Sequence, residues 1–66
     1  MYLAFVTHDP QSNTLEATWI EPISNADGEV QELRRVKCRN YSPEQKADFV
    51  SDLGEAANKY VTMAGW

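Results

Sequence analysis

The sequence has little of what most catalytic and metal-binding sites are built from. Its 66 residues include one cysteine, Cys38, and one histidine, His8. A lone cysteine cannot form an internal disulfide, and neither residue lies in the CxxC or HxxxH spacing typical of metal sites. A nucleophile needs a base that is itself oriented by a third group, and no motif surrounds His8. We therefore expect no enzyme activity, no metal and no cofactor.

Long apolar runs and glycine-rich loops are also missing. No segment approaches the roughly 20 apolar residues of a membrane span, and none resembles the loops that hold phosphate groups. The apolar stretch in residues 1–6 has no basic lead and soon gives way to polar residues, unlike the longer apolar segment of a secretory signal peptide. We expect a protein of the reducing cytoplasm that does not contact a membrane.

Basic residues are absent from the first half of the chain. Residues 1–33 contain six acidic residues and no Lys or Arg, whereas four of the six basic residues lie within residues 34–39. The net charge of −4 and the pI of about 4.7 argue against nonspecific attraction to nucleic acid or anionic lipid. The local basic stripe is either a binding surface or a strand that neutralises its acidic neighbours.

The composition is that of one small ordered domain covering residues 1–66. Hydrophobic residues make up 42% and charged residues 24% of the chain, which is too apolar for a disordered protein of this modest net charge. A chain of this size buries only about 60% of its unfolded surface, so its core is marginal. Self-association would strengthen such a core.

Two of the predicted strands form the first hairpin. Residues 2–8 are rich in β-branched and aromatic types, and residues 14–21 alternate between apolar and polar side chains. The segment between them, residues 9–13, has the composition of a hairpin loop. The first two strands are therefore expected to pair as neighbours.

Asp27-Gly28 is a strong signal for a second hairpin turn. It places the third strand at about residues 30–39. A two-residue turn would set Trp19 opposite Val36, and a four-residue loop would shift the register by two. Both choices keep the same side chains on the same face.

Ser42, Pro43 and Gln45 predict the start of a helix. Ser42 is a favourable N-cap, Pro43 suits the first helical position, and Gln45 can reach back to the N-cap backbone. Apolar residues then follow helical spacing without losing phase across Gly54, which favours one helix to about Met63. The alternative is a first helix that ends just before Gly54.

These elements predict an α+β fold: a three-stranded antiparallel β-meander with one C-terminal helix packed on one face (βββα). We expect Trp66 to fold back and enlarge the core, because an indole buries about 150–250 Å². The strand residues expected beneath the helix are Leu3, Phe5, Leu15, Ala17, Trp19, Val36 and Cys38.

The opposite face of the predicted sheet combines apolar and basic residues. The simplest role for Glu16 on this face is an ion pair with Lys37 or Arg39, worth about 0.2–1 kcal/mol. The alternative is a recognition surface, because Arg and Tyr combine planar contact area with hydrogen-bonding tips. Its candidate partner-binding residues are Tyr2, Ile20, Leu33, Arg35, Lys37 and Arg39.

The leading functional hypothesis is a noncatalytic small protein-interaction module that binds through this sheet face. A protein partner, or a second copy of the chain pairing through an exposed edge strand, is compatible with the acidic net charge. The alternative is a nucleic-acid-binding domain that uses the basic third strand, an architecture that some DNA-binding domains share. The six acidic residues before Arg34 weigh against it, because such proteins are usually basic.

Glu44, Asp48 and Asp52 form an acidic stripe with a spacing of four residues along the predicted helix. Like charges at this spacing repel each other by a few tenths of a kcal/mol per pair, partly offset near the helix N-terminus by the helix dipole. We expect this stripe to be a solvated outer face.

Four segments of the chain carry a resemblance to known sequences. They are residues 2–10 (YLAFVTHDP), 15–19 (LEATW), 36–42 (VKCRNYS) and 52–54 (DLG). Together they resemble short hypothetical proteins encoded in bacterial and prophage gene sets, and the likeness spans nearly the entire chain. The resemblance implies a small bacterial or phage accessory protein that works by binding. It implies no activity, ligand or functional residue.

Overall fold

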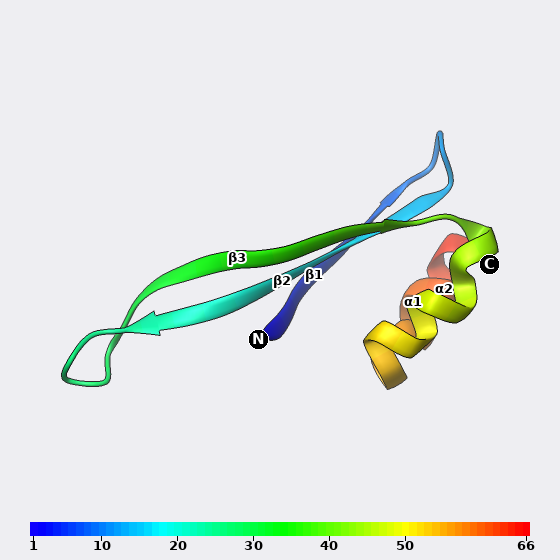
Figure 1. Ribbon diagram of the computed structural model, residues 1–66. Helices are drawn as coiled ribbons and strands as arrows, with labels where there is room; N and C mark the ends of the chain where they lie inside the picture. The colour runs from blue at the N-terminus through cyan, green and yellow to red at the C-terminus, as the bar shows by residue number, and fades with distance from the viewer.

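The protein folds as one three-stranded antiparallel sheet followed by a C-terminal helical segment (Figure 1). The computed structural model describes residues 1–66. The strands are β1 (Tyr2–Asp9), β2 (Thr14–Ser24) and β3 (Val30–Tyr41), and β2 lies between the other two. The predicted α+β meander with its helical element on one face is confirmed.

Each hairpin loop is held by a side chain near its start. The Asp9 carboxylate accepts a hydrogen bond at 3.0 Å from the backbone N–H two residues later, which lowers the pKa of Asp9. In the second loop, Oδ1 of Asn25 accepts from the backbone N–H groups of Asp27 and Glu29 at 2.9 and 3.0 Å. Gly28 has a φ of 83°, a left-handed conformation that glycine adopts without strain. The predicted Asp-Gly turn therefore lies within a longer loop.

The C-terminal segment begins at the predicted cap. The backbone N–H of Ser42 donates to Oε1 of Gln45 at 3.0 Å, and Pro43 occupies the first helical position. The Gln45 side chain thus gives one backbone N–H group at the helix start a partner. Proline at the first position has no N–H group that could be left unpaired. The elements, where η marks a single 3₁₀ turn, are η1 (Pro43–Gln45), α1 (Lys46–Leu53), η2 (Gly54–Ala56) and α2 (Ala57–Ala64).

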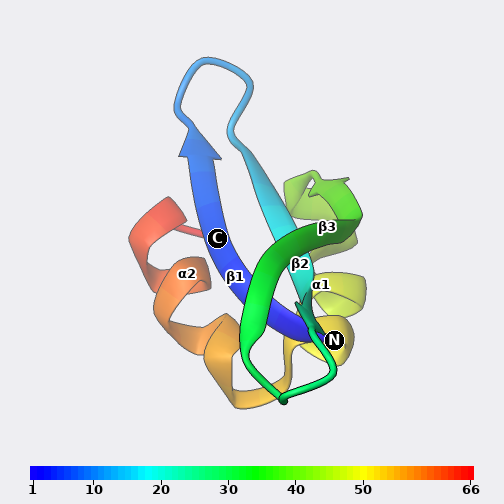
Figure 2. The same ribbon diagram turned by 90° about the vertical axis from the view of Figure 1, so that its left-hand side faces the viewer.

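Gly54 interrupts the helical segment. Its φ of 65° and ψ of −137° are far from helical values and are accessible mainly to glycine. The continuous helix favoured by the apolar spacing is therefore wrong here, and the alternative of a first helix that ends just before Gly54 is confirmed. The break turns α2 back beside α1 (Figures 1 and 2), so that the Lys46 Nζ lies 3.5 Å from the carbonyl oxygen of Trp66.

The core is small and lies between the helices and one end of the sheet. The Phe49 ring meets the rings of Tyr41 and Trp66 edge-on, with centroids 5.1 and 5.8 Å away. Nε1 of Trp66 also donates to the Asn13 side chain at 3.3 Å, so the predicted return of Trp66 to the core is confirmed. The buried apolar residues are Leu15, Ala17, Trp19, Tyr41, Phe49 and Ala57.

A bulge in β1 changes which of its residues reach the core. Leu3 lies opposite Trp19, as the alternation predicts, but the register shifts between Leu3 and Phe5. Val6 therefore lies opposite Ala17 and packs on the core, while Phe5 remains exposed. The prediction that Phe5 lies beneath the helix is wrong, because the extra residue of a bulge moves all later side chains to the other face.

A second bulge changes the faces of the last part of β3. From Ile20 to Ile23 the register is the one that a two-residue turn predicts, but it shifts between Trp19 and Ile20 and again between Ile23 and Ser24. Trp19 therefore lies opposite Lys37 instead of Val36. Val36 and Cys38 are both exposed, so the prediction that they lie beneath the helix is wrong. As in β1, one extra residue reverses the inward and outward positions.

The outer part of the β2–β3 hairpin, residues 20–35, extends beyond the helices as an arm (Figure 1). The protein measures 44 × 23 × 16 Å, and its radius of gyration is 14.0 Å. A compact domain of 66 residues would have a radius of about 11 Å. The helices therefore cover only one end of one face of the sheet, and the arm has no part of its own chain packed over it.

Candidate interaction surface

The basic stripe of β3 is divided between the two faces of the sheet. Arg35 lies opposite Ile20, on the face away from the helices. Lys37 and Arg39 lie opposite buried residues of β2, on the face that the helices cover. The prediction that all three basic residues share one face is therefore wrong, because the bulge lies between Arg35 and Lys37.

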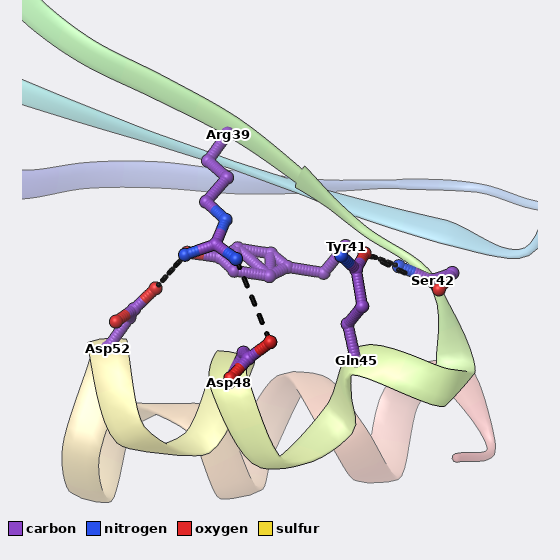
Figure 3. Close-up of polar contacts among 6 residues, drawn as sticks. All are labelled: Arg39, Tyr41, Ser42, Gln45, Asp48 and Asp52. Carbon is purple, nitrogen blue, oxygen red and sulfur yellow. Dashed lines mark hydrogen bonds and ion pairs between the residues drawn. The ribbon is translucent and has the colours of Figure 1, made fainter.

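Arg39 is held by the acidic stripe of the helix (Figure 3). Its Nη1 lies 2.9 Å from Oδ2 of Asp52, and its Nη2 lies 3.8 Å from Oδ2 of Asp48. The guanidinium carbon is 4.8 Å from the ring centroid of Tyr41. Asp48 and Asp52 thus face β3 and pair with Arg39, which corrects the prediction of an outer stripe, although Asp48 remains exposed like Glu44. The fold uses these charges to join the last part of β3 to α1.

Tyr41 completes this polar cluster from inside the core. Its ring is buried, and its hydroxyl donates to Oδ2 of Asp52 at 2.8 Å (Figure 3). Burial, together with the hydrogen bond to the Asp52 carboxylate, raises the pKa of Tyr41 to about 12. The cluster is therefore an anchor between strand and helix, and no buried polar side-chain atom in it lacks a hydrogen-bond partner.

Two more basic residues of the stripe have partners within the chain. The ammonium of Lys37 lies 4.6 Å from the ring centroid of Trp19, a cation–π arrangement. Nη2 of Arg34 lies 3.8 Å from Oε2 of Glu21 in the arm. Glu16 lies opposite Asn40, so the predicted ion pair of Glu16 with Lys37 or Arg39 is wrong. The basic stripe is largely used to neutralise the chain's own carboxylates and to cover an aromatic ring.

The face away from the helices is uncovered, and six of its eleven residues are apolar; we call it the open face. Strand pairing joins its residues in neighbouring rows, because residues opposite each other share a face. The side chains of Tyr2, Phe5 and Leu33 are 65%, 51% and 62% exposed. The open face consists of Tyr2, Phe5, Thr7, Glu16, Thr18, Ile20, Pro22, Leu33, Arg35, Cys38 and Asn40.

Four of the six candidate partner-binding residues lie together on this face. Tyr2 is opposite Ile20, and Ile20 is opposite Arg35 on its other side. Leu33 belongs to the adjacent row, opposite Pro22. Lys37 and Arg39, the other two candidates, lie on the helix face. The sequence thus identified three of the six apolar residues of the surface and its one basic residue, Arg35, but wrongly added two basic residues of the helix face.

Phe5, Pro22 and Cys38 are members of the open face that the sequence did not reveal. Phe5 and Cys38 are displaced by the two bulges, which leave no clear signal in the sequence. Pro22 has a recognisable reason to be in a strand: β1 pairs with β2 only as far as Ile20, so Pro22 is at an edge and has no ladder bond to donate on that side.

The row of Phe5, Thr18 and Cys38 lies in the middle of the open face. Thr18 is buried between its neighbours, and its Oγ1 donates to Sγ of Cys38 at 3.7 Å. Cys38 itself is exposed. The only thiol of the protein therefore lies within the apolar surface rather than beneath it.

The structure contains no pocket and no group of three or more His, Cys, Asp or Glu residues arranged to hold a metal ion. Nε2 of His8 donates to Oδ1 of Asn13 at 3.1 Å in the first hairpin. None of the helices is both long and apolar enough to cross a membrane. The absence of enzyme activity stays a prediction from the sequence.

Comparisons with known proteins assign no family to the chain. No family model matches it, and no curated protein and no solved structure is significantly similar to it. The resemblance to bacterial and prophage proteins therefore stays a prediction, and the open face is described by its own chemistry alone.

Proposed function

We propose that this protein is a noncatalytic interaction module that binds another protein chain through the open face. The observation that carries the proposal is the exposure of Tyr2, Phe5 and Leu33 on a sheet face that the protein's own helices leave uncovered. Exposed apolar residues that adjoin one another mark interaction sites more often than scattered ones do.

The composition of the open face also supports a protein partner. It places an aromatic and an arginine, Tyr2 and Arg35, on either side of Ile20 in one row. Tyr and Arg are enriched at the centres of protein interfaces because they combine large contact area with hydrogen-bonding tips. Glu16 and Arg35 are the only charged residues of the open face, so its net charge is zero.

The nucleic-acid alternative has weaker support. Nucleic-acid affinity depends on several basic residues that can reach phosphates together. Here Arg39 is held by two carboxylates and Lys37 lies over an indole on the helix face, which leaves Arg35 as the basic residue of the open face. A protein partner therefore fits the distribution of charge better.

The cellular setting belongs to the same proposal. We place the protein among small accessory proteins of bacteria or phages that act in the cytoplasm by binding. This part rests on the sequence resemblance and on the sequence features described above.

Affinity capture with matched variants tests the proposal. The full chain, a Leu33→Glu variant and a Met63→Glu variant would be used as baits against lysates of the source organism. Leu33 and Met63 are 62% and 55% exposed, so both variants add one charge at similar exposure, but only Leu33 is on the open face. We expect a partner retained by the wild type and by Met63→Glu and lost by Leu33→Glu. Equal retention by all three baits would contradict the proposal.

A further inference from the structure

The geometry points to a second copy of this chain as the partner: we propose that two molecules pack their open faces together about a two-fold axis. The helices would lie on the outside of the resulting two-layered sheet. This inference rests on the proposed function and names the partner of the same surface. It also explains why one face of the sheet is left without a cover.

The charge pattern of the open face is complementary to itself. Glu16 and Arg35 have opposite signs and lie on opposite sides of the row of Phe5, Thr18 and Cys38. A two-fold axis along that row reverses the strand direction of the second copy. It therefore brings Arg35 of each molecule over the end of the other sheet where Glu16 lies. The face is neutral, although the whole protein carries a net charge of −4, so two copies meet without like charges at the contact.

The size of the face suits a dimer of ordinary dimensions. In β2 the open face runs from Glu16 to Pro22, seven residues, which corresponds to a length of roughly 23 Å. The exposed parts of Tyr2, Phe5, Leu33 and their neighbours give several hundred Å² per copy, the order of the roughly 800 Å² per partner of a standard interface. Pairing would also cover Tyr2, Phe5 and Ile20 between the two sheets, as in a β-sandwich.

Pairing through strand edges is less compatible with the structure. An antiparallel pair of β3 edges centred on residues 34–39 would bring the basic residues of the two copies together, and like charges opposite each other are destabilising. The registers of both β1 and β3 against β2 are interrupted by bulges, which discourage edge pairing. The open face has neither obstacle.

Sedimentation equilibrium of the full chain over micromolar to millimolar concentrations tests the inference directly. We expect the wild type and Met63→Glu to reach the mass of a dimer. Leu33→Glu should weaken dimerisation at least about 100-fold, because two-fold symmetry places the added charge twice in one interface. Leu33 lies outside the core, and circular dichroism would confirm that each variant is folded.

A strictly monomeric wild type would overturn the inference. A dimer that persists in both Leu33→Glu and Phe5→Glu would also overturn it, because the contact would then lie outside the open face. These outcomes can be told apart from failure of the proposed function. If the protein is monomeric but binds a foreign chain that Leu33→Glu does not retain, the proposed function stands and only the dimer is excluded. If it is monomeric and Leu33→Glu retains the same proteins as the wild type, both proposals fail.

Cys38 provides an independent readout of the arrangement. It is exposed and lies in the row through which the axis is placed, so the two thiols of a dimer should lie close together. A short bismaleimide joins two thiols by adding each sulfur to one of its double bonds. We expect a cross-linked dimer from the wild type and Met63→Glu and much less from Leu33→Glu. Equal cross-linking of wild type and Leu33→Glu at the same concentration would contradict packing through the open face.

Discussion

The two ends of the same sheet differ in how far their side chains are buried. At the end covered by the helices, Leu15 and Tyr41 are completely buried, whereas in the arm Val30 and Leu33 are 58% and 62% exposed. These residues belong to the same two strands and have similar apolar character. The difference shows that burial here depends on how far the helical segment reaches over the sheet, and not on the strand sequences themselves.

The polar contacts differ in the same way between the two ends. The covered end has Asp52 accepting hydrogen bonds from both Arg39 and Tyr41, with distances of 2.9 and 2.8 Å. The arm has the pair of Arg34 and Glu21 at 3.8 Å, with both side chains at least half exposed. Charged contacts are worth more where neighbouring groups exclude water. Stability should therefore be concentrated at the covered end.

Removal of the Phe49 ring should have the largest effect, a severe loss of stability at the covered end of the sheet. Phe49 is completely buried between Tyr41 and Trp66, and Phe49→Ala should cost about 3–5 kcal/mol. A domain of this size has a total stability of about 3–10 kcal/mol, so much of the variant should be unfolded. Urea unfolding followed by circular dichroism measures the change. Val50→Ala at the adjacent exposed position is the control and should change stability by less than about 1 kcal/mol.

Gly54→Ala tests whether the covered end depends on the return of α2. The backbone at Gly54 is in a conformation that alanine adopts only with strain, and no atom of another part of the chain lies within 4 Å of the added Cβ. We expect a loss of about 1–3 kcal/mol from backbone strain alone. Ser51→Ala within α1 is the control. Unchanged stability of Gly54→Ala, or amide protection that continues without a gap through Gly54, would contradict the break between the helices.

High pH should loosen the anchor formed by Tyr41. The pKa of Tyr41 is raised from 10.0 to about 12 in the folded protein, so the unfolded chain loses this proton first. The contribution is present below pH 10 and is lost as the pH rises from 10.0 to about 12. Urea unfolding across this range should show a steeper decline for the wild type than for Tyr41→Phe. Tyr2→Phe on the open face should decline like the wild type, and identical curves for all three proteins would argue against a buried hydroxyl.

Arg34→Ala should have the smallest effect. The pair of Arg34 and Glu21 is long, at 3.8 Å, and its side chains are 58% and 50% exposed. Exposed pairs of this kind contribute about 0–1 kcal/mol. We expect thermal unfolding of Arg34→Ala to be close to that of the wild type, while Arg39→Ala at the covered end should unfold at a lower temperature. A larger loss for Arg34→Ala would mean that the arm is more tightly coupled to the core than its exposure indicates.

Local signals in the sequence predicted the elements well. The cap formed by Ser42 and Gln45 and the inward positions of Leu15 and Ala17 are as the sequence indicates, and a hairpin loop does contain Asp27 and Gly28, although it has five residues instead of two or four. Each of these depends on residues close together in the chain, through turn chemistry, capping or alternation. The candidate surface was predicted in part, because four of its residues lie where the predicted faces hold: in β1 before the bulge, in β2 and in the arm.

Long-range features of the sheet were not predictable in the same way. The bulges after Leu3 and beside Trp19 reverse Phe5, Val36 and Cys38, and a single extra residue in a strand has no distinctive sequence signature. The partners of Arg39 were missed for a related reason. From the sequence alone, Asp48 and Asp52 were predicted to form a solvated stripe. The register of β3 instead places Arg39 next to them.

The sequence by itself determined the order of the strands, the turns between them and the start of the helical segment, because these follow from backbone preferences and short-range contacts. The tertiary structure decided which face each side chain occupies, whether the helix continues through Gly54, and which part of the sheet is covered. The physical reason is that register, helix direction and burial depend on how distant segments fit together over one small core. The open face is a consequence of that fit: the short helices cover one end of one side of the sheet and leave Tyr2, Phe5 and Leu33 exposed on the other.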